Sequence, residues 1–95
     1  MFDKLVARVA HRLDEARIPY MVIGGQAVLR YGEPRLTKDI DIALGMCIEE
    51  LHRVRAFLKV SRLKNLAPSP DAFVRKTYVL PVEDVDSGIR IDLIF

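Results

Sequence analysis

The sequence lacks the features that mark secreted and membrane proteins. Its single cysteine, Cys47, cannot form a disulfide within the chain, so nothing indicates an oxidising compartment. No apolar stretch approaches the roughly 20 residues that a membrane-spanning helix needs. Residues 1–18 carry charges throughout and have no apolar segment of signal-peptide length. We therefore expect a soluble cytoplasmic protein without a membrane partner.

The chain also lacks an excess of one charge and the most common phosphate-binding loops. Its 15 basic and 13 acidic residues give a net charge of +2, which is too balanced for a protein that coats nucleic acid. Neither G-x-x-x-x-G-K-[ST] nor G-x-G-x-x-G occurs. The two histidines, His11 and His52, have no second histidine or cysteine at ligand spacing, so we expect both to be solvated.

The length of 95 residues leaves room for one hydrophobic core, so we expect a single domain over residues 1–95. So small a core leaves scope for a homo-oligomer to add stability. Residues 2–16 place apolar side chains at helical spacing and predict a helix that ends before Pro19. Residues 20–23, YMVI, form a continuous apolar run, which predicts a strand buried on both faces.

Two glycines follow this predicted strand. We expect Gly24 and Gly25 to close it, and residues 26–31, QAVLRY, to form about two turns of helix that end at Gly32. Residues 38–44 then alternate polar and apolar side chains, which predicts a second strand.

The second half of the chain predicts another helix and two more strands. Residues 47–60 have one apolar face, in which Cys47 is a small apolar helix residue, and Asp71 is placed to cap one further turn. Residues 76–95 predict two strands around a turn rich in Asp, Ser and Gly. The expected fold is α+β, a small mixed sheet with helices packed mainly on one face. A basic stripe beside the apolar face of the 47–60 helix is either solvated or contacts RNA or an acidic protein; it comprises His52, Arg55, Lys59 and Arg62.

Two aspartates in the predicted 38–44 strand stand out. Side chains at positions i and i+2 of a strand share a face and lie about 6.5–7 Å apart, so Asp39 and Asp41 would project together, away from Ile40. Two carboxylates at this spacing repel each other unless water or a cation stabilises them. Either both are solvated on an exposed face, or they hold a divalent cation such as Mg²⁺.

A glycine pair and a third aspartate also allow either a structural or a functional interpretation. Gly24 and Gly25 form either a tight turn that needs no Cβ, or a turn that lets a phosphate approach the start of the following helix. Asp92 lies between apolar residues of the last predicted strand, where an isolated aspartate is unusual. If that strand neighbours residues 38–44, Asp92 completes a cluster of three carboxylates.

Taken together, the stretch VIGGQAVLRYGEPRLTKDIDIALG resembles the nucleotidyltransferase superfamily that includes DNA polymerase beta. It looks closest to the small bacterial branch of minimal nucleotidyltransferases and of abortive-infection and toxin–antitoxin proteins. The resemblance covers about residues 18–45 and 90–95. Within it, the positions that match the Gly-Gly-x-Ala and Arg-x-Thr-x-Asp-Ile-Asp patterns of that branch are Gly24, Gly25, Ala27, Arg35, Thr37, Asp39, Ile40 and Asp41.

The resemblance implies a nucleotidyltransferase fold and an enzyme that uses Mg²⁺, with two ions as one option, to transfer NMP from an NTP such as ATP. It implies that Gly24 and Gly25 hold the nucleotide phosphates. Asp39 and Asp41 would bind the metal, and Asp92 would join them and help to activate the acceptor hydroxyl. Such chemistry depends on placement and charge stabilisation rather than on covalent catalysis.

Two basic residues and several partners remain open under this resemblance. Arg35 and Lys38 either contact the triphosphate or are solvated. The implied acceptors are a tRNA 3′ end, a protein side chain or a small molecule. The chain ends three residues after Asp92, whereas many members of the superfamily continue with further helices, so we expect a domain truncated at its C-terminus or one without part of the site wall. The rival hypothesis is a partner-binding module without turnover, such as an antitoxin-like subunit that engages a toxin.

Overall fold

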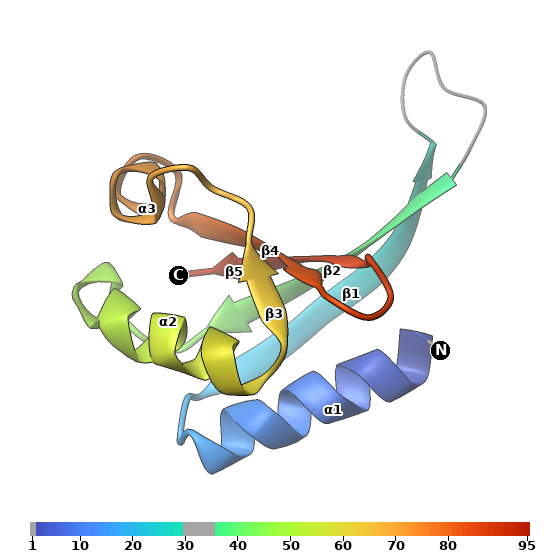
Figure 1. Cartoon of the computed structure of the whole chain (residues 1–95), viewed down its shortest axis with the longest axis horizontal. Coiled ribbons are helices and arrows are strands. Elements are labelled where there is room, and N and C mark those ends of the chain that lie inside the picture. Colours follow the sequence, from blue (N-terminus) through green and yellow to red (C-terminus); the bar gives the residue numbers. More distant parts are fainter. Residues whose placement is uncertain (1, 30–35) are drawn as a thin grey trace.

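The computed structural model describes residues 2–29 and 36–95, and the side chains of residues 4–23 and 40–95. Within them the chain forms a small α+β domain (Figure 1). Its elements, in order, are α1 (Phe2–Glu15), β1 (Tyr20–Leu29), β2 (Leu36–Leu44), the 3-10 turn η1 (Ile48–Glu50), α2 (Leu51–Val60), β3 (Leu63–Asn65), α3 (Pro70–Thr77), β4 (Val79–Asp84) and β5 (Arg90–Ile94). In this part of the chain, no helix is long and apolar enough to cross a membrane.

The strands form one mixed sheet in the order β1-β2-β5-β4-β3. The pairs β1–β2, β5–β4 and β4–β3 are antiparallel, whereas β2 and β5 are parallel. The expected mixed sheet is therefore confirmed, and so are the two strands around the Asp-, Ser- and Gly-containing turn at residues 85–89.

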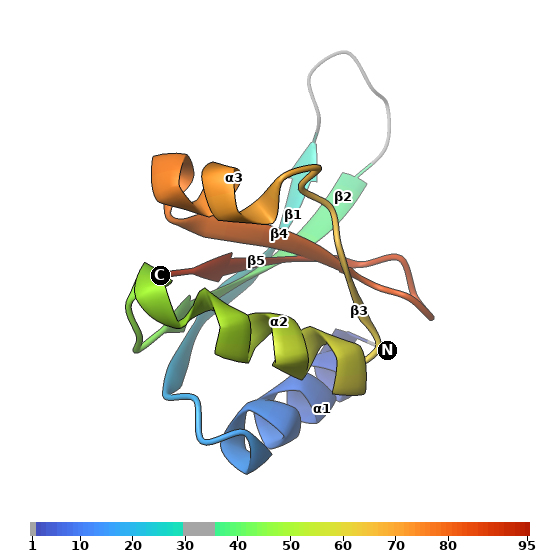
Figure 2. The same cartoon turned by 60° about the vertical axis from the view of Figure 1, so that its left-hand side comes forward.

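One face of the sheet carries the hydrophobic core. Alternation along the strands sends one set of apolar side chains to this face, each at most 1% exposed: Ile40, Ile42, Leu80, Val82, Ile91 and Leu93. Helices α1 and α2 cover the face, as Figures 1 and 2 both show, and contribute Leu13 and Val54 at 0% exposure. Because each buried Leu or Ile contributes about 1.5–3 kcal/mol, this layer accounts for much of the favourable free energy of folding.

The shortest strand, β3, forms the edge of the sheet opposite to β1, and the third helix lies near this end. Helix α3 packs beside β4, and Asp71 in its first turn lies 3.7 Å from Arg55 of α2. The helix is longer than the single turn expected, since it runs over Pro70–Thr77, and it ends where Tyr78 takes a left-handed conformation with φ of 61°. Sequence periodicity did not predict β3, because three residues are too few to establish a pattern.

The largest correction concerns the two glycines. Gly24 and Gly25 do not close the first strand, and residues 26–29 are not helical: β1 continues to Leu29 and pairs with β2. The rest of the expected helix, with Gly32, lies outside the described residues. The pairing shifts register between Val22 and Gly24, so one extra residue is accommodated on β1, and glycine is common at such irregularities. Backbone pairing with β2 thus outweighs the weak helical preference of a short segment.

Two smaller expectations are also wrong. The strand over residues 20–23 is not buried on both faces, because β1 lies at the edge of the sheet; Met21 is 64% exposed and Ile23 is 58% exposed. Cys47 is not an apolar helix residue: it is exposed and precedes η1. The helix itself is confirmed over Leu51–Val60.

Candidate functional site

The sheet brings two of the three predicted aspartates together. Strand β5 lies directly beside β2, and the parallel register places Asp92 opposite Asp41. Their apolar neighbours Ile40 and Ile91 are also paired and are fully buried under the helices. Since side chains alternate along a strand, Asp41 and Asp92 lie on the opposite face, which α1 and α2 do not cover. The condition stated for a carboxylate cluster, that the last strand neighbours residues 38–44, is therefore met.

The other predicted site residues can be placed by register alone. Asp39 lies in β2 opposite Arg90, and Lys38 lies opposite Ala27, but the side chains of these residues are not among those described. Arg35 lies outside the described residues. Where these three side chains point therefore remains a prediction.

The glycines lie next to the aspartates, although not at the start of a helix. Gly24 pairs with Asp41 and Gly25 pairs with Ile40. Gly24 therefore occupies the position beside Asp41 on β1, and it contributes no side chain there. A phosphate cradle formed by a helix N-terminus after Gly25 is absent from the described part of the chain, because residues 26–29 are extended. Whether either glycine binds a phosphate therefore remains a prediction.

Arg90 supplies the positive charge closest to Asp92. Its Nε donates a hydrogen bond to Oδ1 of Asp92 over 2.9 Å, and the two residues lie at i and i+2 on the same strand. The side chains are 39% and 20% exposed, so water reaches this ion pair and weakens it. Neighbouring strands lie about 4.7–4.9 Å apart, which brings a second carboxylate, that of Asp41, onto the same small area.

A row of alternating charges crosses the sheet beside this aspartate pair. The register places Asp39, Arg90, Glu83 and Lys64 next to one another on β2, β5, β4 and β3. Opposite charges in directly paired positions stabilise a sheet by about 0.2–1 kcal/mol per pair. This row places opposite charges next to one another in sequence register, whereas the Asp41–Asp92 pair places like charges opposite each other.

This face fits a divalent cation in its donor chemistry. Carboxylate oxygens are the ligands that Mg²⁺ takes from proteins, usually one or two carboxylates together with water and substrate phosphates. Among the described side chains, which do not include that of Asp39, no group of three His, Cys, Asp or Glu residues could hold a metal ion. Asp41 and Asp92 supply two carboxylates, within the one or two that Mg²⁺ usually takes from a protein.

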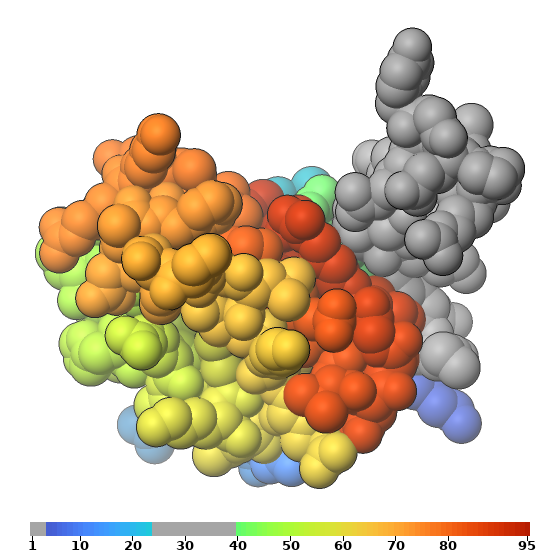
Figure 3. Space-filling view, turned by 45° about the horizontal axis from the view of Figure 1, so that its top comes forward, coloured from blue at the N-terminus to red at the C-terminus, as the bar shows by residue number. Residues whose placement is uncertain are grey.

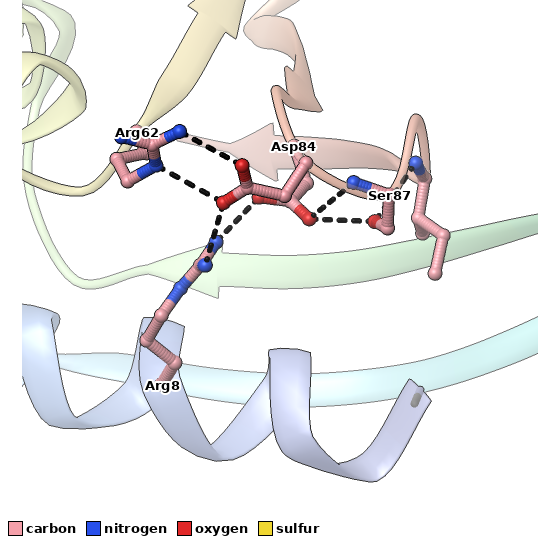
Figure 4. Close-up of polar contacts among 6 residues, drawn as sticks. Arg8, Arg62, Asp84 and Ser87 are labelled. Atoms are coloured by element: carbon pink, nitrogen blue, oxygen red, sulfur yellow. Dashed lines mark hydrogen bonds and ion pairs between the residues drawn. The ribbon is translucent and has the colours of Figure 1, made fainter.

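A second polar cluster lies on the helix-covered face, and sequence reasoning missed it. Asp84 at the end of β4 is 3% exposed and accepts hydrogen bonds from the amide and the hydroxyl of Ser87, at 3.0 and 2.6 Å, and from Arg8 of α1 (Figure 4). Arg62 donates two hydrogen bonds to Asp86, at 3.0 and 2.8 Å. The β4–β5 turn is thereby tied to α1 and to the α2–β3 connection, whose atoms lie beside it in Figure 3.

The contacts of this cluster shift the pKa values of its members. Burial alone would raise the pKa of Asp84, but the hydrogen bonds from Ser87 and Arg8 outweigh burial and lower it. The hydrogen bond from Arg62 lowers the pKa of Asp86, and the same bond raises the pKa of Arg62. The signal available in the sequence was strand alternation: in VLPVED, Asp84 is in phase with Leu80 and Val82, on the core face.

The predicted basic stripe is partly neutralised within the chain. Arg62 pairs with Asp86, and Arg55 lies 3.7 Å from Asp71 of α3. His52 and Lys59 are exposed, as expected for solvated residues, and so is His11. The stripe is therefore a weaker candidate for an RNA contact than four free cations would be.

Comparison with known proteins adds no relative to this description. No protein-family model, curated protein or solved structure matches the chain. What can be said of the site therefore comes from its residues and their arrangement.

Proposed function

We propose that this chain is an Mg²⁺-dependent nucleotidyltransferase domain, which transfers NMP from an NTP to an acceptor hydroxyl and releases pyrophosphate. The observation that carries the proposal is the direct pairing of Asp41 with Asp92 on adjacent parallel strands, on the face left uncovered by α1 and α2. Like charges directly opposite each other repel, and a nucleotide-bound cation between them would turn this repulsion into binding.

The carboxylates would have two roles in this reaction, metal binding and proton transfer. Asp41 and Asp92, with Asp39 from the same strand, would hold Mg²⁺, which when bound supplies charge neutralisation for the phosphates. Asp92, as one of these ligands, would also orient the acceptor hydroxyl and accept its proton. The acceptor oxygen would bond to the α-phosphorus as the bond from that phosphorus to pyrophosphate breaks, and the proton would pass from the Asp92 carboxyl group to water.

The experiment that tests the proposal is nucleotidyl transfer by the purified chain. The protein would be incubated with Mg²⁺ and each α-³²P-labelled NTP in turn, with total tRNA, a protein lysate or small hydroxyl compounds as acceptors. Label should move to one acceptor class. Asp41→Asn and Asp92→Asn should each lower the rate at least a hundredfold, whereas Asp14→Asn, which changes an exposed aspartate of α1, should not.

A second candidate is favoured by the exposed edge of the sheet. Strand β1 has no charged residue over Tyr20–Leu29 and exposes Met21, Val22 and Ile23, and such an edge is a template for pairing with a strand of another protein. The chain would then act as an antitoxin-like module that binds a partner without turnover. Absence of transfer with every NTP, together with a co-purifying protein that is lost in Ile23→Lys, would replace the enzyme proposal with this one.

A further inference from the structure

A cavity between α2 and the β3–β4 end of the sheet lies apart from the aspartates of the proposed site. We call it the leucine cavity; its volume is about 200 Å³, and it is lined by Arg55, Leu58, Lys59, Leu63, Asn65 and Leu80. Helix α2 packs against β3, and β3 pairs with β4, so neighbouring elements hold these residues in place. Leu80 belongs to the buried layer on the helix-covered face, opposite to Asp41 and Asp92. A role for this cavity therefore does not depend on the proposed reaction.

Most of the lining of the leucine cavity is apolar. Leu58, Leu63 and Leu80 are each at most 6% exposed and come from three different elements. The side-chain amide of Asn65 is already engaged: it donates to the carbonyl oxygen of Ala67 over 2.7 Å, and its oxygen accepts from the Ala67 amide over 2.9 Å. An apolar cavity of about 150 Å³ can take up benzene. The leucine cavity thus suits an apolar group about as large as one six-membered ring.

Two cations stand beside this apolar lining, and both belong to the basic stripe of α2. Arg55 and Lys59 are four residues apart, so their side chains are neighbours on one helix face, where like charges repel. Arg55 lies 3.7 Å from Asp71, too far for a hydrogen bond, and both of these side chains are more than half exposed. Within the part of the chain that the structure describes, Lys59 has no ion pair and no acidic residue lines the cavity. A negatively charged group between Arg55 and Lys59 would relieve their repulsion.

We propose that the leucine cavity binds a small organic carboxylate whose apolar body is about the size of one ring. The body contacts the three leucines, and the carboxylate accepts hydrogen bonds from Arg55 and Lys59. Both cations remain partly in water and the leucines are already largely buried, so the dissociation constant is roughly 1 mM. The ligand needs both of its parts, because the apolar body fills the cavity and the charge is read by the two cations.

The test uses phenylacetate as the probe and follows the leucine methyl signals of the full chain by ¹H–¹³C NMR. Phenylacetate should shift the methyl signals of Leu58, Leu63 and Leu80, with a dissociation constant of roughly 1 mM. Two comparison compounds separate the contributions of body and charge. Phenylacetamide keeps the ring without the charge, and acetate keeps the charge without the ring; each should bind at least about threefold more weakly than phenylacetate.

Three single variants test which cations the carboxylate contacts. Arg55→Gln and Lys59→Gln should each weaken phenylacetate binding about threefold, the effect of losing an ion pair that is open to water. Lys64→Gln is the matched control and should leave the affinity unchanged. Lys64 is exposed and lies between two lining residues of β3, so alternation along the strand directs it away from the cavity. Circular dichroism would establish that each variant is folded.

Several results would overturn the proposal. Equal affinity for phenylacetate and phenylacetamide would show that the cations do not read the charge, and equal affinity for acetate would show that the cavity does not take the ring. Equal losses in Lys59→Gln and Lys64→Gln would indicate non-specific attraction to a basic surface. Shifts confined to methyl groups outside the leucine cavity, or no shift at about ten times the expected dissociation constant, would also reject the site. Nucleotidyl transfer is assayed separately, and its presence or absence does not bear on this result.

Discussion

Asp84 and Asp92 lie on neighbouring strands of one sheet, yet they point to opposite faces and have very different surroundings. Asp84 is 3% exposed and accepts hydrogen bonds from Ser87 and Arg8 on both of its oxygens. Asp92 is more exposed, shares its face with Asp41, and has one hydrogen bond, from Arg90, among those described. Asp84 thus accepts three hydrogen bonds, whereas Asp92 accepts one among those described.

This difference separates a structural carboxylate from one suited to a ligand. A buried carboxylate must be fully hydrogen-bonded, because an unsatisfied charge in the core costs several kcal/mol. With donors on both of its oxygens, it has little capacity left for a cation. A carboxylate at the surface of the sheet can keep free lone pairs because water satisfies them until a ligand arrives. The comparison therefore predicts that the Asp84 cluster determines stability and that the Asp41–Asp92 pair determines activity.

The largest effect on stability should come from Asp84→Asn. The substitution removes the charge that Arg8 faces and weakens the bonds from Ser87, so we expect a loss of about 2 kcal/mol in the free energy of unfolding. Urea denaturation at pH 7, followed by circular dichroism, measures this loss. Asp86→Asn is the matched control: it lies two residues away but is exposed, so it should shift the urea midpoint far less. Equal shifts for the two variants would refute the greater structural weight that burial gives to Asp84.

The pH dependence of stability tests the structural role of the Asp84 carboxylate directly. The folded-state pKa of Asp84 is lowered from its ordinary value of 3.8, so its contribution is complete above that value and is lost as the pH falls through the lower folded-state pKa. The wild type should therefore lose stability below about pH 4. The difference between the wild type and Asp84→Asn should shrink over the same range in a series of urea titrations from pH 7 to pH 2. A difference that stays constant down to pH 2 would contradict the charged state assigned to Asp84.

Much of the fold was predictable from the sequence because strong periodicity and turn residues marked its elements. Helix α1 and the β4–β5 hairpin follow directly from helical spacing and from alternation around the turn at residues 85–89. The first strand was not predictable in the same way. Residues 26–29 are short, uncharged and compatible with helix or strand, and the choice is made by backbone pairing with β2, which local sequence does not encode.

The candidate site was likewise predictable from the sequence only in part. Alternation along the strands predicted that the side chains of Asp41 and Asp92 would lie on the face opposite to their buried apolar neighbours. Both side chains do so. The adjacency of β2 and β5 was only a condition in the sequence, because it joins segments about 50 residues apart. The Arg90 bond to Asp92 needed only i, i+2 spacing on one strand and could have been found. The Arg8 bond to Asp84 links a helix to a distant turn, and it required the packed structure.

The smallest predicted effect has the opposite sign to that of Asp84→Asn. Asp41→Asn keeps the shape and much of the hydrogen-bonding capacity of the side chain but removes one of two like charges that lie directly opposite each other. Relief of this repulsion should raise the free energy of unfolding by about 0.5 kcal/mol at low salt. The gain should disappear as added salt screens the charges. The measurement is urea denaturation of wild type and variant at low and at high NaCl concentration. A clear loss of stability would mean that Asp41 is a structural residue like Asp84. A gain in stability combined with lost nucleotidyl transfer would indicate that Asp41 lowers the stability of the fold but is needed to bind the cation.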